Sequence, residues 1–174
     1  MAQSIGQEPA ILLSNTPSIT YHTDGGYSQG YSYFRIRGID QTRINITLNG
    51  VPLNDPTDQA FYFSNFADIL NSTDQIQIQR GIGASTTGAS AFGASINLST
   101  LSTINSNKPY GEISSSYGSF NSLKNTVKLG TGLIDGKWNF EGRLSKISSD
   151  GFIDRSSSDL RSYYLSGSYL GEKT

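Results

Sequence analysis

The strongest constraint in this sequence is the alternation of apolar and polar residues in its second half. The runs 123–129, 138–145 and 162–169 mostly alternate between the two kinds, and residues 110–120 alternate less clearly. Successive side chains of a β-strand point to opposite faces, so a period of two predicts strands with one apolar and one polar face. The runs approach about ten residues, the length of a tilted strand that crosses a membrane.

The alternation by itself leaves two alternatives: a soluble antiparallel sheet with one wet face, or strands of an outer-membrane β-barrel. The connections differ in kind, because 133–136 is a short turn and 149–159 is a longer polar loop. Barrels of the outer membrane have short periplasmic turns and longer external loops. Trp138, Tyr163 and Tyr169 lie near strand ends, as in an interfacial aromatic girdle. These features favour the membrane strands.

The first half, up to about residue 104, follows a different pattern of short β-branched runs separated by Gly, Asn, Asp and Pro. The dipeptide Asn49-Gly50 is the one that a tight type I′ hairpin turn favours, and it follows an alternating run. Residues 66–70 are predicted to form a short helix capped by Ser64 or Asn65. Strands are predicted at 33–37 ending at Gly38, 44–48, 76–80 ending at Gly81, and 94–100. We therefore expect a small mixed α+β unit.

Composition excludes several classes of function. The 174 residues carry 13 basic and 14 acidic side chains without a basic stripe, so nucleic acid is not an expected partner. The chain has no Cys and one His, so neither a metal centre nor a cofactor is predicted. The Gly-rich segments 81–83 and 88–93 match no nucleotide-binding loop, and no nucleophile elbow occurs. Asp55 and Asp58 are explained by a turn better than by calcium. We predict no enzyme.

The chain has no apolar run near the ~20 residues of a membrane helix, and no signal-peptide features at its N-terminus. Its first half contains five notable stretches in a fixed order and spacing: LLSNTPSI (12–19), RIRG (35–38), ITLNGVPLND (46–55), IQIQRG (76–81) and the Gly-rich run 88–97 that closes in Leu98-Ser99-Thr100. Together these stretches resemble the plug domain of TonB-dependent outer-membrane receptors. The resemblance covers roughly residues 8–104 and is closest to the Bacteroidetes iron-complex type.

The resemblance implies an α+β plug domain over residues 1–104, followed over 105–174 by the first three or four antiparallel strands of an incomplete transmembrane barrel. In this family a barrel of about 22 strands encloses the plug. We expect the chain to begin inside the plug, without the TonB-binding box that precedes it. The resemblance implies an intact protein in the outer membrane, with TonB and membrane lipid as partners.

Two arginines have a role that the resemblance implies. Arg37 and Arg80 each stand immediately before a glycine, Gly38 and Gly81. A solvated charge beside a turn glycine is the alternative for either one alone. By resemblance, both guanidinium groups face the barrel wall and pair with glutamates on later strands, as a latch that holds the plug. The planar fork of Arg suits such pairing with a carboxylate.

The resemblance also implies a ligand surface. The loops 22–32, 39–43 and 54–63 correspond to the plug apices that face outward. Tyr27, Tyr31, Gln41 and Tyr62 are the predicted contacts to a siderophore or haem-like iron complex, whereas Phe61 and Phe63 fit packing inside the plug at least as well. His22 is predicted to be an ordinary loop residue. The alternatives are an importer of oligosaccharide, peptide or cobalamin in the same superfamily, and a soluble β-rich adhesin or binding module.

Overall fold

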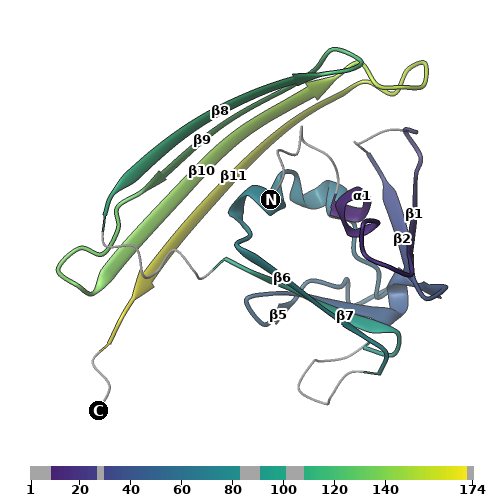
Figure 1. The fold of residues 1–174 in the computed structure, drawn as a ribbon, viewed down its shortest axis with the longest axis horizontal. Helices are drawn as coiled ribbons and strands as arrows, with labels where there is room; N and C mark the ends of the chain where they lie inside the picture. The colour runs from purple at the N-terminus through teal and green to yellow at the C-terminus, as the bar shows by residue number, and fades with distance from the viewer. Residues whose placement is uncertain (1–8, 27–29, 83–90, 101–107, 172–174) are drawn as a thin grey trace. The chain divides into compact units, whose positions relative to one another are not determined.

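The computed structural model describes residues 9–26, 30–82, 91–100 and 108–171. These residues divide into two compact units, one that ends at Thr100 and one that begins at Lys108 (Figure 1). The predicted domain boundary at residue 104 lies outside the described residues.

A four-stranded mixed sheet forms the centre of the first unit. Strands β4 (Ile44–Leu48) and β7 (Ala94–Ser99) run parallel in the middle, with β5 (Val51–Pro52) antiparallel to β4 and β6 (Gln75–Arg80) antiparallel to β7. The order is β5-β4-β7-β6. In both strands apolar residues alternate with polar ones. Ile44, Ile46 and Ile96 are completely buried, and the polar Asn45 between the first two is buried as well.

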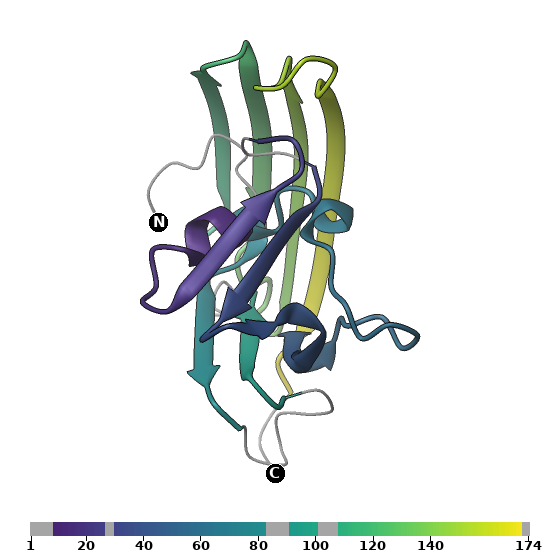
Figure 2. The same cartoon turned by 90° about the vertical axis from the view of Figure 1, so that its right-hand side faces the viewer.

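A second, three-stranded antiparallel sheet completes this unit. It consists of β1 (Ile19–Thr23), β2 (Ser32–Ile36) and β3 (Ile39–Asp40), with the helix α1 (Pro9–Leu13) before it. Proline suits the first turn of α1, where a backbone N–H has no helical partner. Phe34 and Ile36 point from β2 into the same hydrophobic core as Ala10 and Leu13 of α1. Figure 2 shows the β1–β2 hairpin face on, in purple and blue.

The predicted helix at 66–70 is wrong. The structure has two short 3-10 helices there instead, η2 (Phe63–Phe66) and η3 (Ile69–Ser72), and Asp68 between them has a left-handed backbone with φ 59°. The rings of Phe61 and Phe63 meet edge to face at 4.7 Å, and Ile69 joins the same core. The two short 3-10 helices with a break between them turn these apolar side chains toward the core, which one continuous α-helix would not do. The predicted class, a mixed sheet with short helices, is confirmed.

Two tight turns have the same geometry. In Asn49-Gly50 the φ angles are 52° and 83°, and the flanking Leu48 and Val51 face each other in register. In Arg37-Gly38 they are 53° and 79°, between the paired residues Ile36 and Ile39. Two residues with positive φ between paired strand ends define a type I′ turn. Gly81, with φ 95°, ends β6 in a conformation that few other residues adopt.

The second unit is a single antiparallel sheet of long strands. Strands β8 (Tyr110–Gly118), β9 (Ser122–Gly130), β10 (Trp138–Ser149) and β11 (Ser158–Tyr169) lie side by side in chain order, and the sheet is curved (Figure 1). The connections 119–121 and 150–157 lie at one end of this sheet, and 131–137 lies at the other. Phe120 and Phe152 stack edge to face at 5.4 Å between the first two connections. The described part of the chain contains no helix that is long and apolar enough to cross a membrane.

The two faces of this sheet differ in chemistry. On one face Lys128 forms an ion pair with Glu141 at 3.1 Å, and the Arg143 guanidinium donates to the hydroxyl groups of Ser145 and Ser162 at 2.7 and 3.1 Å. The opposite face is exposed and mostly apolar. Its large apolar side chains are Ile113, Tyr117, Leu123, Val127, Leu129, Trp138, Phe140, Leu144, Tyr163, Leu165 and Tyr169.

This distribution is the reverse of a water-soluble sheet, which turns its apolar face toward the core. Leu144 is 64% exposed and Ile113 is 83% exposed. A strand that faces lipid on one side and a polar lumen on the other has this alternation. The sheet is open in the described residues, with β8 and β11 at its edges.

Candidate functional site

An aromatic cluster joins the two sheets of the first unit. Tyr31 stands directly before β2, and its ring meets that of Tyr62 edge to face at 5.8 Å. Tyr33, two residues along β2 on the same face, stacks on His22 of β1 at 4.9 Å. His22 and Tyr33 stack because the hairpin register places them opposite each other. The cluster thus draws on both strands of one hairpin and on the segment that follows β5.

Carboxylates next to these phenols change their acidity. The hydroxyl group of Tyr62 donates to Oδ2 of Asp58 at 3.4 Å. The negative charge of Asp58, with some desolvation, raises the pKa of Tyr62 above its ordinary value. Desolvation, followed by the charge of Asp24, raises the pKa of Tyr33. Like ordinary tyrosines, both phenols are protonated at neutral pH and can donate hydrogen bonds, and the raised pKa keeps them protonated to more alkaline pH.

The loop that carries Asp58 and Tyr62 is held by its own side chains. Asp55 accepts from Thr57 N at 2.7 Å, which lowers the pKa of that carboxyl, and Asp58 accepts from Ala60 N at 2.8 Å. These are turns closed by Asp side chains. No group of three or more His, Cys, Asp or Glu suited to a metal ion occurs among the described residues.

Asn54 anchors this loop to the central sheet. Its Oδ1 accepts from Ile46 N at 2.8 Å, and its Nδ2 donates to the carbonyl groups of Ile44 at 3.0 Å and Gln59 at 2.8 Å. One amide thus satisfies backbone groups of β4 and fixes the far end of the loop. This contact positions Asp58 and Tyr62 relative to the rest of the unit.

The two Arg-Gly steps meet the same short segment between α1 and β1. The Arg80 guanidinium donates to the carbonyl oxygen of Pro17 at 3.2 Å, and the backbone N–H of Arg37 donates to that of Ser18 at 2.8 Å. Both arginines are exposed. The turn after β2 and the end of β6 therefore lie close together, although they belong to different sheets.

A family model decides what this arrangement of sheets and turns is. The model of the TonB-dependent receptor plug domain matches residues 1–95, which is more than half of the chain. The chain belongs to this family. The resemblance in sequence is thereby confirmed for the family, and the Bacteroidetes subtype stays a prediction.

Solved structures of two metal transporters and an uptake receptor share the fold. The FrpB iron transporter from Neisseria meningitidis is 17% identical, with a TM-score of 0.73 over 97% of this chain and 27% of that one. The copper transporter OprC is 15% identical, with a TM-score of 0.70 over 93% and 25%. The ferric yersiniabactin uptake receptor FyuA from Yersinia pestis is 20% identical, with a TM-score of 0.61 over 90% and 25%. The chain spans about a quarter of their length.

The predicted ligand residues of the plug have different surroundings. Tyr31 and Tyr62 lie together, as described above. Gln41 is buried in η1 (Gln41–Arg43), and its Oε1 accepts from Phe34 N at 3.4 Å, so its side chain is engaged inside the plug. Tyr27 lies outside the described residues.

Sequence reasoning missed part of the cluster. His22 belongs to strand β1 and does not lie in a loop, and neither Tyr33 nor the two carboxylates Asp24 and Asp58 were singled out as neighbours of the predicted tyrosines. The alternation of 32–36 could have placed Tyr33 on the outer face, beside Tyr31. Phe61 and Phe63 pack inside the plug, as their apolar character suggested.

Proposed function

We propose that the protein acts in an energy-coupled uptake receptor of the outer membrane, with residues 1–104 as plug and 105–174 as the first barrel strands. One observation carries the membrane assignment: a plug-domain chain continues into a sheet whose exposed face is apolar and whose other face is polar. A soluble adhesin would leave that apolar face without a purpose. The end with the connections 119–121 and 150–157 is the external one in this proposal, because 150–157 is the longest polar connection.

Arg37 and Arg80 form the latch in this proposal. The segment that leads to the N-terminus supports it, since Pro17 accepts from the Arg80 side chain and Ser18 accepts from the backbone N–H of Arg37. TonB, bound to a box upstream of the plug, would pull on that segment and disturb both latch residues at once. The arginines would then leave their carboxylate partners on the barrel wall, and a path past the plug would open.

The substrate that we propose is an iron complex of the siderophore or haem class. The cluster of Tyr31, Tyr33 and Tyr62 supports it, since phenol rings stack on flat aromatic groups and neutral hydroxyl groups donate to anionic oxygens. Several proteins of the same fold are named as iron or siderophore transporters. Another nutrient is the alternative, because a copper transporter shares the fold equally well.

The test is uptake of radiolabelled iron by cells that express the protein at its natural length. Ferric catecholates, ferric hydroxamates and haem are supplied in the presence and absence of TonB. We expect TonB-dependent uptake of one class, with binding about fivefold weaker for Tyr31→Ala or Tyr62→Ala, the value of one aromatic contact. Tyr21→Ala is the matched control, because Tyr21 is an exposed tyrosine of β1 outside the cluster. Uptake that ignores TonB, or an equal loss in Tyr21→Ala, would contradict the proposal.

A further inference from the structure

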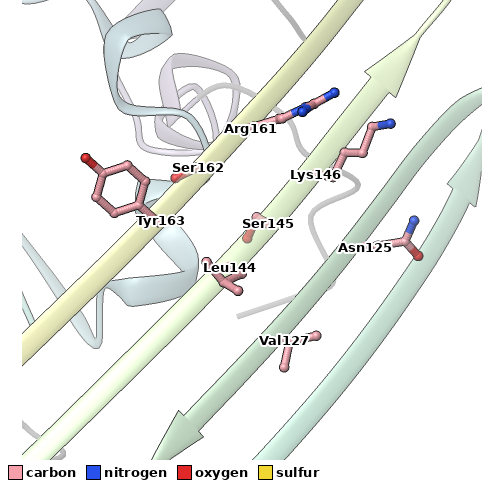
Figure 3. A pocket seen from close by; sticks show the side chains of 8 residues that line it. All are labelled: Asn125, Val127, Leu144, Ser145, Lys146, Arg161, Ser162 and Tyr163. Atoms are coloured by element: carbon pink, nitrogen blue, oxygen red, sulfur yellow. The ribbon is translucent and has the colours of Figure 1, made fainter.

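An open groove lies on the exposed face of the β8–β11 sheet. It has a volume of about 510 Å³ and crosses β9, β10 and β11. Figure 3 shows its side chains in two rows: Asn125, Lys146 and Arg161 in one, and Val127, Leu144 and Tyr163 in the next. Rows on one face of a sheet are about 7 Å apart. The groove thus joins a polar, cationic row directly to an apolar one.

The cationic row carries charge that the protein does little to neutralise. Lys146 and Arg161 are directly opposite each other in the register. The ion pair between Lys146 Nζ and Oδ2 of Asp159 is long, at 3.9 Å, and both side chains are 55% exposed, so the pair is weak. Within the described part of the chain, no carboxylate pairs with Arg161. Two adjacent cations with a single distant anion leave the row electropositive.

The position of this row on the sheet is unusual. Two cations on a mostly apolar, lipid-facing surface are costly at the middle of a bilayer and nearly free at its interface. The row lies two steps along β10 from Leu144 and toward the end with the connection 150–157. Toward the other end the same face continues with Leu129, Leu165, Phe140 and Trp138. The cationic row thus lies at the level of lipid headgroups and the apolar rows at the level of acyl chains. This arrangement fits a lipid with an anionic headgroup.

We propose that this groove binds a lipid with a phosphate headgroup. Arg161 grips the phosphate with its planar fork, Lys146 adds a second charge, and Asn125 donates from its amide. The acyl chains lie along Val127, Leu144 and Tyr163. This inference rests on the proposed function, because it requires that the exposed face of the sheet meets lipid.

The experiment uses the chain of residues 1–174 and vesicles of phosphatidylcholine with or without phosphatidic acid. Two readings are taken on each sample. Quenching of the single Trp, Trp138, by brominated acyl chains reports whether the apolar face meets lipid. Co-flotation with vesicles reports affinity for the headgroup. The variants are Arg161→Gln, Lys146→Gln and the double variant. Arg155→Gln is the matched control, since it removes one exposed cation from the connection 150–157 at the same end of the sheet.

We expect a preference for vesicles with phosphatidic acid that falls roughly fivefold in each single variant and further in the double one. Arg155→Gln should behave like the unaltered chain, inorganic phosphate should compete weakly, and Trp138 should be quenched equally in all variants. Equal binding to both kinds of vesicle, an equal loss in Arg155→Gln, or full competition by inorganic phosphate would overturn the lipid site. Absence of Trp138 quenching in the unaltered chain would instead overturn the membrane assignment itself.

Discussion

Asn54 holds the loop that follows β5 against the central sheet. Its single amide makes three hydrogen bonds to backbone groups of Ile44, Ile46 and Gln59. Replacement by Ala leaves those partly buried groups without partners, which costs about 2–3 kcal/mol of unfolding free energy. Urea denaturation of the chain measures this loss.

Asn54→Asp should be at least as harmful, because a carboxylate would face two carbonyl oxygens. The exposed Asn65 provides the control, and Asn65→Ala should change little. If Asn54→Ala were as stable as Asn65→Ala, the loop would be held by its Asp turns alone.

Arg37 has a strained backbone conformation. Its φ of 53° is unfavourable for an Arg, whereas Asn accepts this conformation readily at the first position of a type I′ turn. Arg37→Asn should therefore stabilise the chain by about 0.5–1 kcal/mol in urea denaturation. The same change should loosen the plug in the intact receptor, measured as dye leakage through the outer membrane.

Arg35→Gln is the charge control for this variant, because Arg35 is an exposed cation on the neighbouring strand whose ion pair with Asp40 is long, at 3.9 Å. It should leave leakage normal. If Arg37→Asn destabilises the chain, the backbone of Arg37 is not strained as argued. If it leaks no more than Arg35→Gln, then Arg37 is a turn residue without a latch role.

Among the elements, most strands were predictable from the sequence, whereas strand β1, helix α1 and the 3-10 helices were not. Alternation and the Asn-Gly and Arg-Gly steps depend on local chemistry, so the strands around Gly38, Gly50 and Gly81 could be placed within a residue or two. The segment 63–72 depends on tertiary burial of Phe61, Phe63 and Ile69, which no local pattern encodes. Gln41 is buried for a related reason, since η1 turns it toward Phe34 N.

The cluster around Tyr62 shows what lies beyond sequence reasoning at this scale. Tyr31 and Tyr62 could be predicted as outward residues, because they stand in polar loops. Their neighbours His22 and Tyr33 depend on the hairpin register, and Asp58 depends on the fold of its loop. The loops that carry Tyr31 and Tyr62 can therefore be predicted from the sequence, whereas the contacts within the aromatic cluster cannot.

The same cluster gives a prediction on pH. The charge of Asp58 raises the pKa of Tyr62. Its phenol should therefore ionise at a more alkaline pH than free tyrosine, whose pKa is about 10. Because the folded pKa is the higher one, the favourable contribution of the neutral phenol is complete below pH ~10 and is lost as the pH rises through the folded pKa. Asp58→Asn should move the pKa of Tyr62 back toward about 10. The titration is measured as the difference in absorbance between each protein and the same protein with Tyr62→Phe. An unchanged titration in Asp58→Asn would show that desolvation alone sets the pKa.

At the scale of the whole molecule, the proposed membrane role requires that the β8–β11 sheet expose its apolar face, the reverse of a sheet in a soluble protein. The alternation of 123–129, 138–145 and 162–169 was visible in the sequence, but it is compatible with either orientation. The structure supplies what the sequence could not, namely that the apolar face is the exposed one and that the polar face forms ion pairs and hydrogen bonds. The match to the TonB-dependent receptor plug domain agrees with this orientation.

A cysteine scan along β10 tests that orientation most directly. The chain has no native cysteine, so single cysteines can be placed at each position from Trp138 to Ser145 in the protein expressed at its natural length in an outer membrane. A solvent-sensitive fluorescent label reports the polarity at each position, and a membrane-impermeant thiol reagent reports access to water. The account predicts strict alternation: positions 138, 140, 142 and 144 in an apolar environment and closed to the reagent, and 139, 141, 143 and 145 in a polar one. Labels that report water at 140 and 144, or no alternation at all, would contradict it.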